Sequence, residues 1–276
     1  MVEQLISKAS MLVEEALPYI QKFKGKIFVI KYGGKAMINE ELKQAVTKDI
    51  ALLKTIGVRP IIVHGGGPAI TREMEKAKIE PRFVNGLRVT DDATIRIVRR
   101  VFRTINGEIR DHLKSHGIKT RDATGCIRAR QRDPDLGLVG DVTGVSVSEL
   151  RAILNRDEIP VVSPVGRNGD VYYNINADTA ATELAARLRA EKLTILTDVD
   201  GVIENGQFVS QLSIRQARKH IRTGVITSGM IPKVEACIRA VTAGCHKAHL
   251  INGTTPHALL FEIFTDKGVG TQVVKE

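Results

Sequence analysis

Hydrophobic residues recur every three or four positions in the first part of the chain. Between Glu3 and Gln21 this spacing predicts an amphipathic helix about 15–18 residues long, with one apolar face. Pro18, near the end of the pattern, should kink or stop the helix. We predict that the apolar face packs either on the protein's own core or on a second subunit.

Beyond this helix, compact runs rich in β-branched residues alternate with segments of helical periodicity. The predicted strands are Ile27–Tyr32, Pro60–His64, Pro160–Val165, Leu193–Thr197, Ala248–Ile251 and Thr271–Val274. The predicted helices are Glu40–Thr55, Pro68–Lys76, Ala93–Ser115, Val147–Asn155, Asp178–Ala190, Ile214–Thr223 and Lys233–Ala243. Several strands are apolar on consecutive residues, as in strands that are covered on both faces. The alternation therefore predicts an α/β fold with a mainly parallel sheet and helices on both sides.

Two shorter segments, Val142–Ser148 and Asp170–Asn176, are expected to be exposed and to form an antiparallel patch. A boundary between two lobes is expected near Asn174–Asp178. The length permits one large domain or two lobes of about 100–150 residues each.

The 276 residues include 41 Lys+Arg and 31 Asp+Glu, which gives a net charge of +10. An apolar fraction of 43% is enough to build a core, so a disordered chain is excluded. Nucleic-acid binding is disfavoured because aromatic residues, which stack on bases, make up only 4%. The positive charge then serves either solubility or the binding of small anions.

The chain has neither a membrane span nor a signal peptide in its sequence pattern. No apolar run approaches the ~20 residues that a span requires, and acidic and basic residues interrupt the first 23 positions. The chain has three cysteines, an odd number that does not indicate a framework of disulfides: Cys126, Cys237 and Cys245. We therefore expect reduced thiols and a cytoplasmic location.

Two predicted strands run directly into glycine-rich turns. The first turn reads Lys31-Tyr32-Gly33-Gly34 and the second His64-Gly65-Gly66-Gly67-Pro68. Glycines at the carboxyl ends of parallel strands let the backbone approach a ligand, and the following helix N-terminus favours an anion. Two such turns, one of them beside Lys31, predict a cradle for a phosphoryl group.

Three other polar segments are candidates for a site, each with a structural alternative. Arg88, in Asn85-Gly86-Leu87-Arg88-Val89-Thr90, is either a solvent-facing turn residue or a clamp for a carboxylate. Asp178 can cap the helix that follows Asn174-Ile175-Asn176, contribute to a site, or do both. Lys233 lies near a predicted helix start, where an anion nearby would stabilise its charge.

Several familiar sites are absent from the sequence. The chain has no G-x-G-x-x-G dinucleotide fingerprint, no G-x-x-x-x-G-K-[ST] loop and no protein-kinase motif set. His112 and His116 lack the glutamate of a metalloprotease motif, and Cys245, His246 and His249 lack a second ligand pair at zinc spacing. No metal site is predicted.

In their order along the chain, the two glycine turns, the segments that contain Arg88 and Asp178, and Gly229-Met230-Ile231-Pro232-Lys233 resemble the motifs of the N-acetylglutamate kinases. These kinases are a branch of the amino acid kinase family. The resemblance covers residues 26–274, and the Asn-Gly-Leu-Arg-Val-Thr stretch is specific to this branch. It implies an open three-layer α/β/α sandwich and transfer of phosphate from ATP, carrying Mg²⁺, to the γ-carboxylate of N-acetyl-L-glutamate in arginine biosynthesis. Residues 25–176 would form the lobe that binds the amino acid, and residues 177–276 the lobe that binds ATP.

The resemblance also implies roles for individual residues. The phosphoryl group would be stabilised by Lys31, Lys233, Gly34 and Gly66, with Asp178 holding the two lysines. Acetylglutamate would be bound by Gly65, Gly66, Gly67, Arg88, Asn174 and Asn176. The nucleotide would be bound by Lys31, Gly33, Gly34, Thr197, Asp198, Val199, Gly201, Ser228, Gly229, Met230 and Lys233.

An extra N-terminal helix, here residues 1–24, resembles the arginine-inhibited hexamers of this branch, in which such helices interlace three dimers. The segment from His249 to Thr271 also resembles that class. It implies an arginine site made of Tyr19, Lys219, His249, Glu262, Gly268 and Gly270. Asn252-Gly253-Thr254 departs from the Asp-Gly-Arg of many relatives.

Two alternatives are open at this point. A sister kinase of the same fold would act on glutamate, aspartate, carbamate, uridylate or a carrier-linked aminoadipate. A silent sensor would bind arginine or nucleotide without turnover, although a sensor has no need of both Lys31 and Lys233. No residue decides whether a P-II-type signalling protein binds.

Overall fold

The structure is a computed structural model that describes residues 16–37, 39–227, 229–265 and 268–276. Its centre is an eight-stranded sheet with the order β14-β16-β15-β11-β1-β2-β8-β5. All neighbouring strands are parallel except β15 and β16. The strand bounds are β1 Ile27–Tyr32, β2 Arg59–His64, β5 Thr120–Asp122, β8 Ile159–Val162, β11 Lys192–Thr197, β14 Gln211–Ser213, β15 Lys247–Asn252 and β16 Thr271–Val274.

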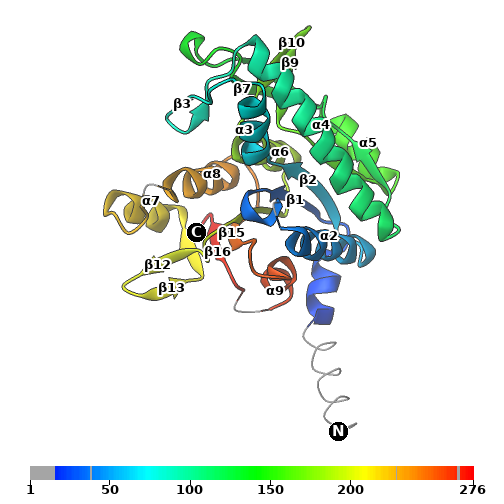
Figure 1. Cartoon of the computed structure of the whole chain (residues 1–276). Helices are drawn as coiled ribbons and strands as arrows, with labels where there is room; N and C mark the ends of the chain where they lie inside the picture. The colour runs from blue at the N-terminus through cyan, green and yellow to red at the C-terminus, as the bar shows by residue number, and fades with distance from the viewer. Residues whose placement is uncertain (1–15, 38, 228, 266–267) are drawn as a thin grey trace.

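Helices cover both faces of this sheet, as Figure 1 shows, with α7 and α8 at one end of the molecule and α4 and α5 at the other. The α-helices are α2 Glu40–Thr55, α3 Gly67–Lys76, α4 Asp92–Ser115, α5 Val147–Asn155, α6 Ala177–Leu188, α7 Ile214–Arg222, α8 Ile231–Thr242 and α9 Ala258–Phe264. Short 3₁₀ helices are η1 Gly34–Met37 and η2 Pro134–Leu136.

The three layers follow from the alternation of side chains along the central strands. In β1, Ile27 and Val29 join a core cluster shared with α5, α6 and α8, whereas Phe28 and Ile30 join the cluster shared with α2, α4 and α9. Because side chains on both faces of the strand are buried, residues 27–30 are all apolar. The predicted α/β sandwich with a mainly parallel sheet is confirmed.

A smaller four-stranded sheet lies beside the main one, and the two segments predicted to form an antiparallel patch are its opposite edge strands, each antiparallel to its own neighbour and not paired with the other. It has the order β10-β9-β6-β7, with bounds β6 Ile127–Gln131, β7 Gly140–Val145, β9 Val165–Asn168 and β10 Val171–Asn174. Val165 therefore begins a separate strand, whereas the sequence predicted that Pro160–Val165 forms one strand. Two hairpins complete the fold, β3 Phe83–Val84 with β4 Leu87–Arg88, and β12 Val202–Glu204 with β13 Gln207–Val209.

The predicted N-terminal helix falls mainly on residues outside the described part of the chain. Residues 16–23 are helical, so the helix continues past Pro18 instead of stopping there. Its last turn is anchored by aromatic contacts, because Phe23 stacks on Tyr19 and packs edge-on against Phe28 of β1. None of the helices in the described ranges has the length and apolar content needed to cross a membrane.

Candidate active site

A cavity of about 660 Å³ lies at the carboxyl ends of β1 and β2, in the position where ligands bind to open α/β sheets. Its walls come from the two glycine turns, the β3–β4 hairpin, α4 and the start of α6. The predicted residues that line it are Lys31, Gly34, Gly65, Gly66, Gly67, Arg88, Asn174, Asn176 and Asp178. Residues from four separate sequence motifs therefore share one cavity.

The two glycine turns are joined to each other by the backbone. The N–H of Gly65 donates to the carbonyl oxygen of Tyr32 at 2.7 Å, which ties the end of β2 to the end of β1. A Cβ at residue 33 would lie 2.9 Å from Lys31 Nζ, so glycine there leaves room for the ammonium group. A Cβ at residue 66 would lie 2.8 Å from the ring of Phe102, so the backbone of that turn lies directly against α4.

Asp178 connects two lysines that are 202 positions apart in sequence, Lys31 and Lys233. Its Oδ1 lies 3.1 Å from Lys31 Nζ and its Oδ2 lies 3.7 Å from Lys233 Nζ. Burial by itself would raise the pKa of Asp178, but the two ammonium groups outweigh burial and hold the pKa below its ordinary value. The carboxylate is thus ionised at neutral pH, and it pairs with Lys31 in the cavity wall and with Lys233 through its second oxygen.

Arg88 is buried in the wall of the cavity, not exposed on a turn. Its Nη2 donates to the carbonyl oxygen of Gly67 at 3.1 Å and to Thr71 Oγ1 at 2.8 Å. The guanidinium also lies 4.6 Å from the ring centre of Phe83. Burial lowers the pKa of Arg88 from its high ordinary value. The hairpin that presents Arg88 turns at Asn85-Gly86, both with positive φ (49° and 75°), as two-residue hairpin loops require.

Asn174 and Asn176 enter the cavity wall with different partners. Asn174 Nδ2 donates to Thr90 Oγ1 at 3.2 Å, which links β10 to the segment after the hairpin. Asn176 caps α6, because its Oδ1 accepts from the N–H groups of Asp178 and Thr179 at 2.9 and 3.1 Å. Because Asn176 caps the helix, the carboxylate of Asp178 does not serve as the cap and pairs with the two lysines instead.

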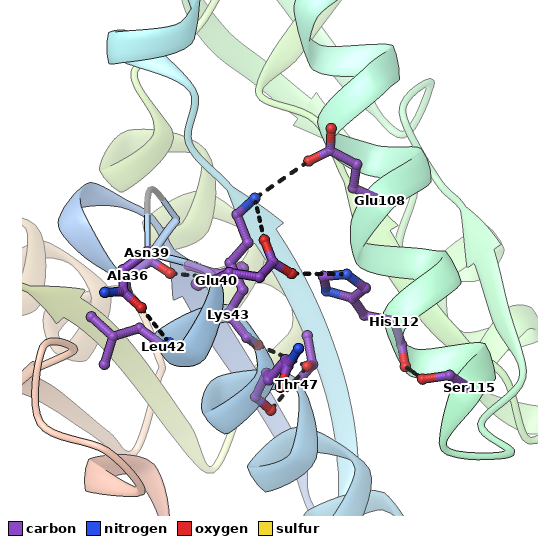
Figure 2. A network of polar contacts seen from close by, with 11 residues as sticks. Ala36, Asn39, Glu40, Leu42, Lys43, Thr47, Glu108, His112 and Ser115 are labelled. Atoms are coloured by element: carbon purple, nitrogen blue, oxygen red, sulfur yellow. Dashed lines mark hydrogen bonds and ion pairs between the residues drawn. The ribbon is translucent and has the colours of Figure 1, made fainter.

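A network of charged side chains joins α2 and α4 along the cavity (Figure 2). Lys43 Nζ lies 3.2 Å from Glu40 and 3.9 Å from Glu108, and His112 Nε2 lies 3.5 Å from Glu40. Of these, Lys43, Glu108 and His112 line the cavity. His112 thus pairs with a carboxylate on the neighbouring helix.

The described nucleotide residues predicted in the C-terminal half do not line this cavity. Thr197 ends β11, the neighbour of β1, and a turn follows it in which Asp198 and Val199 are exposed and Gly201 is half-buried. Gly229 and Met230 precede α8, whose first turn carries Lys233. Asn252 of β15 donates to Asp200 in the same turn at 2.7 Å. Ser228 lies outside the described residues.

A second polar cluster, which we call the His249–Glu262 cluster, lies at the other end of β15. His249 Nδ1 contacts Glu262 Oε1, and Glu262 Oε2 accepts from the N–H groups of Val269 and Gly270, both at 2.8 Å. Burial alone would raise the pKa of Glu262, but these hydrogen bonds hold it below its ordinary value. Burial lowers the pKa of His249. Gly268 lies against the carboxylate, since a Cβ there would meet Oε2 at 2.7 Å.

The charge of Glu262 also acts on Lys192 of β11, where it opposes the lowering of the lysine pKa by burial. Its ammonium lies 4.7 Å from the ring centre of Phe23, which stacks on Tyr19, so the cluster is connected to the N-terminal helix. Lys219 lies on α7, and no described polar contact joins its side chain to Glu262 or His249. The sequence gives little signal for Lys192, because it is the first residue of β11 and a lysine at the start of a strand is commonly exposed.

Comparison with known proteins identifies the family of this chain. The family model described as the amino acid kinase family matches residues 26–252. The chain belongs to the amino acid kinase family. Its relatives include an acetylglutamate kinase from Halothermothrix orenii, 47% identical over 100% of both chains. Another, from Desulforamulus reducens, is 45% identical over 98% of this chain and 99% of its own.

Among solved structures, this amino acid kinase is similar to N-acetylglutamate synthase from Neisseria gonorrhoeae complexed with coenzyme A and N-acetyl-glutamate. The TM-score is 0.89 at 26% identity, over 97% of this chain and 63% of that one. The chain therefore spans less than two thirds of the synthase. The sequence resemblance to the amino acid kinase family is confirmed.

Proposed function

We propose that this protein transfers the γ-phosphoryl group of ATP to the γ-carboxylate of N-acetyl-L-glutamate, as a step of arginine biosynthesis. The observation that carries the proposal is the Lys31–Asp178–Lys233 bridge at a cavity lined by two glycine turns. The names of relatives that match nearly the whole chain support the choice of acceptor.

The reaction needs electrostatic help more than a base. A carboxylate with an ordinary pKa of about 4.3 is ionised at neutral pH and attacks phosphorus without losing a proton. Its approach to another anion costs about 4 kcal/mol per pair of unit charges ~4 Å apart at an effective dielectric near 20. Lys31 and Lys233, held by Asp178, would offset this repulsion as the new O–P bond forms and the bond to ADP breaks.

The backbone and the substrate pocket complete the assignment. Gly34 and Gly66 would donate N–H bonds to the transferring group. Arg88 would hold the α-carboxylate of acetylglutamate, and Gly65, Gly67, Asn174 and Asn176 would hold the rest. Gly33, Thr197, Asp198, Val199, Gly201, Ser228, Gly229 and Met230 would line the nucleotide. Mg²⁺ would arrive as part of the substrate MgATP.

The finer organisation of the chain is part of the same proposal. Residues 25–176 would bind the amino acid and residues 177–276 the nucleotide. The enzyme would work in the cytoplasm, where the buried thiols of Cys126, Cys237 and Cys245 stay reduced.

We also propose that arginine inhibits the enzyme at the His249–Glu262 cluster. A guanidinium needs a carboxylate partner, and Glu262 is an ionised carboxylate beside Gly268 and Gly270. Tyr19 would contribute from the N-terminal helix, which would also assemble three dimers into a homohexamer. Lys219 is part of the same hypothesis. Lys192 is a further candidate, because its charge interacts with that of Glu262.

The deciding experiment is a coupled ADP-release assay on the purified full chain. N-acetyl-L-glutamate should support turnover, whereas free glutamate, aspartate and carbamate should not. Turnover only with a carrier-linked aminoadipate would replace the proposed acceptor, and no turnover with any acceptor would favour a sensor. The same assay with added arginine tests the inhibition.

A further inference from the structure

His64, at the end of β2, lies behind the second glycine turn and does not line the cavity. It is fully buried, and its ring packs edge-on against Phe102 of α4, the same ring that lies under Gly66. Its Nδ1 lies 2.8 Å from the carbonyl oxygen of Gly65. A polar ring is therefore in direct contact with the backbone of the turn.

The other ring nitrogen of His64 is held by Ser163. His64 Nε2 lies 2.9 Å from Ser163 Oγ, and the register of β2 and β8, which pairs Val63 with Val162, places the two residues side by side. Ser163 Oγ also accepts from Asn106 Nδ2 at 3.4 Å and contacts Thr124 Oγ1 at 2.9 Å. All of these partners lie behind the turn.

The partners determine which nitrogen of His64 carries the hydrogen. A carbonyl oxygen only accepts, so the hydrogen between Nδ1 and Gly65 is on Nδ1. Burial lowers the pKa of His64 to about 4, so the ring is neutral at physiological pH even though the nearby charge of Asp122 acts to raise the pKa. A neutral ring that is protonated at Nδ1 has a bare Nε2, and the Ser163 hydroxyl must donate to it.

The hydrogen bond from His64 has a consequence on the opposite side of the peptide group. In a trans peptide group, the carbonyl of Gly65 and the N–H of Gly66 point in opposite directions. Because His64 holds the carbonyl toward the interior, the Gly66 N–H points toward the cavity. Nothing among the described residues accepts a hydrogen bond from this N–H, so it is available to a ligand.

We propose that His64 is a positioning residue that aims the Gly66 N–H at the transferring phosphoryl group, with Ser163 fixing its tautomer. The inference rests on the proposed function and adds to it a residue that touches neither substrate. His64 acts by restricting the rotation of one peptide group, so that its N–H dipole is in place before charge develops on the phosphoryl oxygens.

The first test is the tautomer itself, measured by ¹⁵N–¹H correlation spectra of ¹⁵N-histidine-labelled protein. His64 should carry its proton on Nδ1 from pH 6 to pH 9, a form that is the minor one in free histidine, and Ser163→Ala should change this signal. An Nε2-protonated ring, or a cationic ring at neutral pH, would overturn the proposal.

The second test compares His64→Asn with His64→Gln in the kinase assay. The Asn amide can place its N–H near the position of Nδ1, whereas the longer Gln amide reaches the position of Nε2. Loss of the Gly65 contact in the Gln variant should lower kcat about 10- to 100-fold, with both KM values within about threefold of the parent. The Asn variant should keep most of the activity.

The ranking of the two variants separates positioning from packing. Gln is closer to His in volume, so a purely structural role predicts that Gln is tolerated better than Asn, and that result would overturn the proposal. His246→Asn, at an exposed histidine, serves as the control and should leave kcat unchanged. A wild-type protein without activity on acetylglutamate would instead overturn the proposed function, while the tautomer measurement would still decide the role of His64.

Discussion

The ammonium of Lys31 lies 3.1 Å from the carboxylate of Asp178. Lys31 ends a central strand and Asp178 begins α6, so the contact joins the glycine turn to the far wall of the cavity. The second oxygen of the carboxylate faces Lys233. One acidic residue therefore places two cations where two anionic substrates would meet, and it leaves the bridge with a net positive charge.

Removal of either lysine should lower the rate of the chemical step. We expect Lys31→Ala and Lys233→Ala to reduce kcat about 10²- to 10³-fold with a smaller effect on KM, because each ammonium acts mainly on charge that develops in the transition state. Steady-state kinetics measures this. Lys114→Ala, an exposed lysine on α4, is the control. An unchanged turnover number in either active-site variant would contradict its assigned role.

Replacement of Asp178 by an uncharged residue should affect the chemical step and the binding of ATP differently. In Asp178→Asn the lysines lose the charge that holds them in place, so we expect kcat to fall about 10- to 100-fold. The KM for ATP should stay the same or decrease, because the site becomes more positive. Titration of both substrates gives the two constants. A large increase in the KM for ATP with normal kcat would mean that Asp178 serves nucleotide binding instead.

Arg88 is predicted to depend on the shape of its guanidinium as well as on its charge. Arg88→Lys keeps the charge, but the compact ammonium cannot contact Gly67 and Thr71 and bind a carboxylate at the same time, as the larger guanidinium can. We expect the KM for acetylglutamate to rise about 10- to 100-fold and the KM for ATP to stay unchanged. Arg103→Lys on the exposed side of α4 is the matched control. Equal effects on both substrates would argue against the assigned role.

The His249–Glu262 cluster should affect regulation without affecting basal turnover. Glu262→Gln removes the charge that a guanidinium needs, so inhibition by arginine should weaken at least about tenfold. The measurement is the arginine concentration that halves the rate, with Glu75→Gln as the exposed control.

Deletion of residues 1–22 tests the N-terminal helix in the same assay, together with light scattering. The truncated protein should be neither hexameric nor inhibited by arginine. If it stays hexameric and arginine-sensitive, the helix does not have this role.

The pair between the buried Asp49 of α2 and the partly exposed His257, just before α9, predicts a specific dependence of stability on pH. The two side chains are 2.6 Å apart, and burial raises the pKa of Asp49 from 3.8 to about 6. The folded state then binds more protons than the unfolded state between these values, so its free energy of unfolding should decrease as pH rises through this window. The decrease amounts to about 3 kcal/mol, and no further change is expected well above pH 6.

Asp49→Asn should remove this contribution. Urea unfolding of the parent and the variant at pH 4 and pH 7 should give a difference in stability that changes between the two pH values. The exposed carboxylate of Asp157, paired with Lys54, has a lowered pKa and should give a contribution of opposite sign. A difference between parent and Asp49→Asn that is independent of pH would contradict the prediction.

Local sequence patterns predicted most of the regular structure. Helices α2 and α5 and strand β1 have the predicted bounds, because their periodicity and their capping or turn residues agree. Short or amphipathic segments were missed: the strands β5 and β6, both hairpins and helix α9 have too few residues for a periodic signal. The sequence predicts that Pro18 kinks or stops the helix, whereas the helix continues and aromatic contacts of Phe23 stabilise the turn that follows.

The sequence by itself determined the α/β architecture with a mainly parallel sheet, and it indicated many of the residues of the candidate site. The glycine turns after strands, Arg88 and the two lysines can be recognised from local sequence alone. Only the tertiary structure decided how they combine. It put Lys31 and Lys233 on one carboxylate, buried Arg88 in a wall, and placed His64 behind Gly66. The physical reason is that parallel strands bring their carboxyl ends to one edge of the sheet, however distant they are in sequence. Hydrogen bonds and ion pairs depend on distances of about 3 Å, which no sequence spacing specifies.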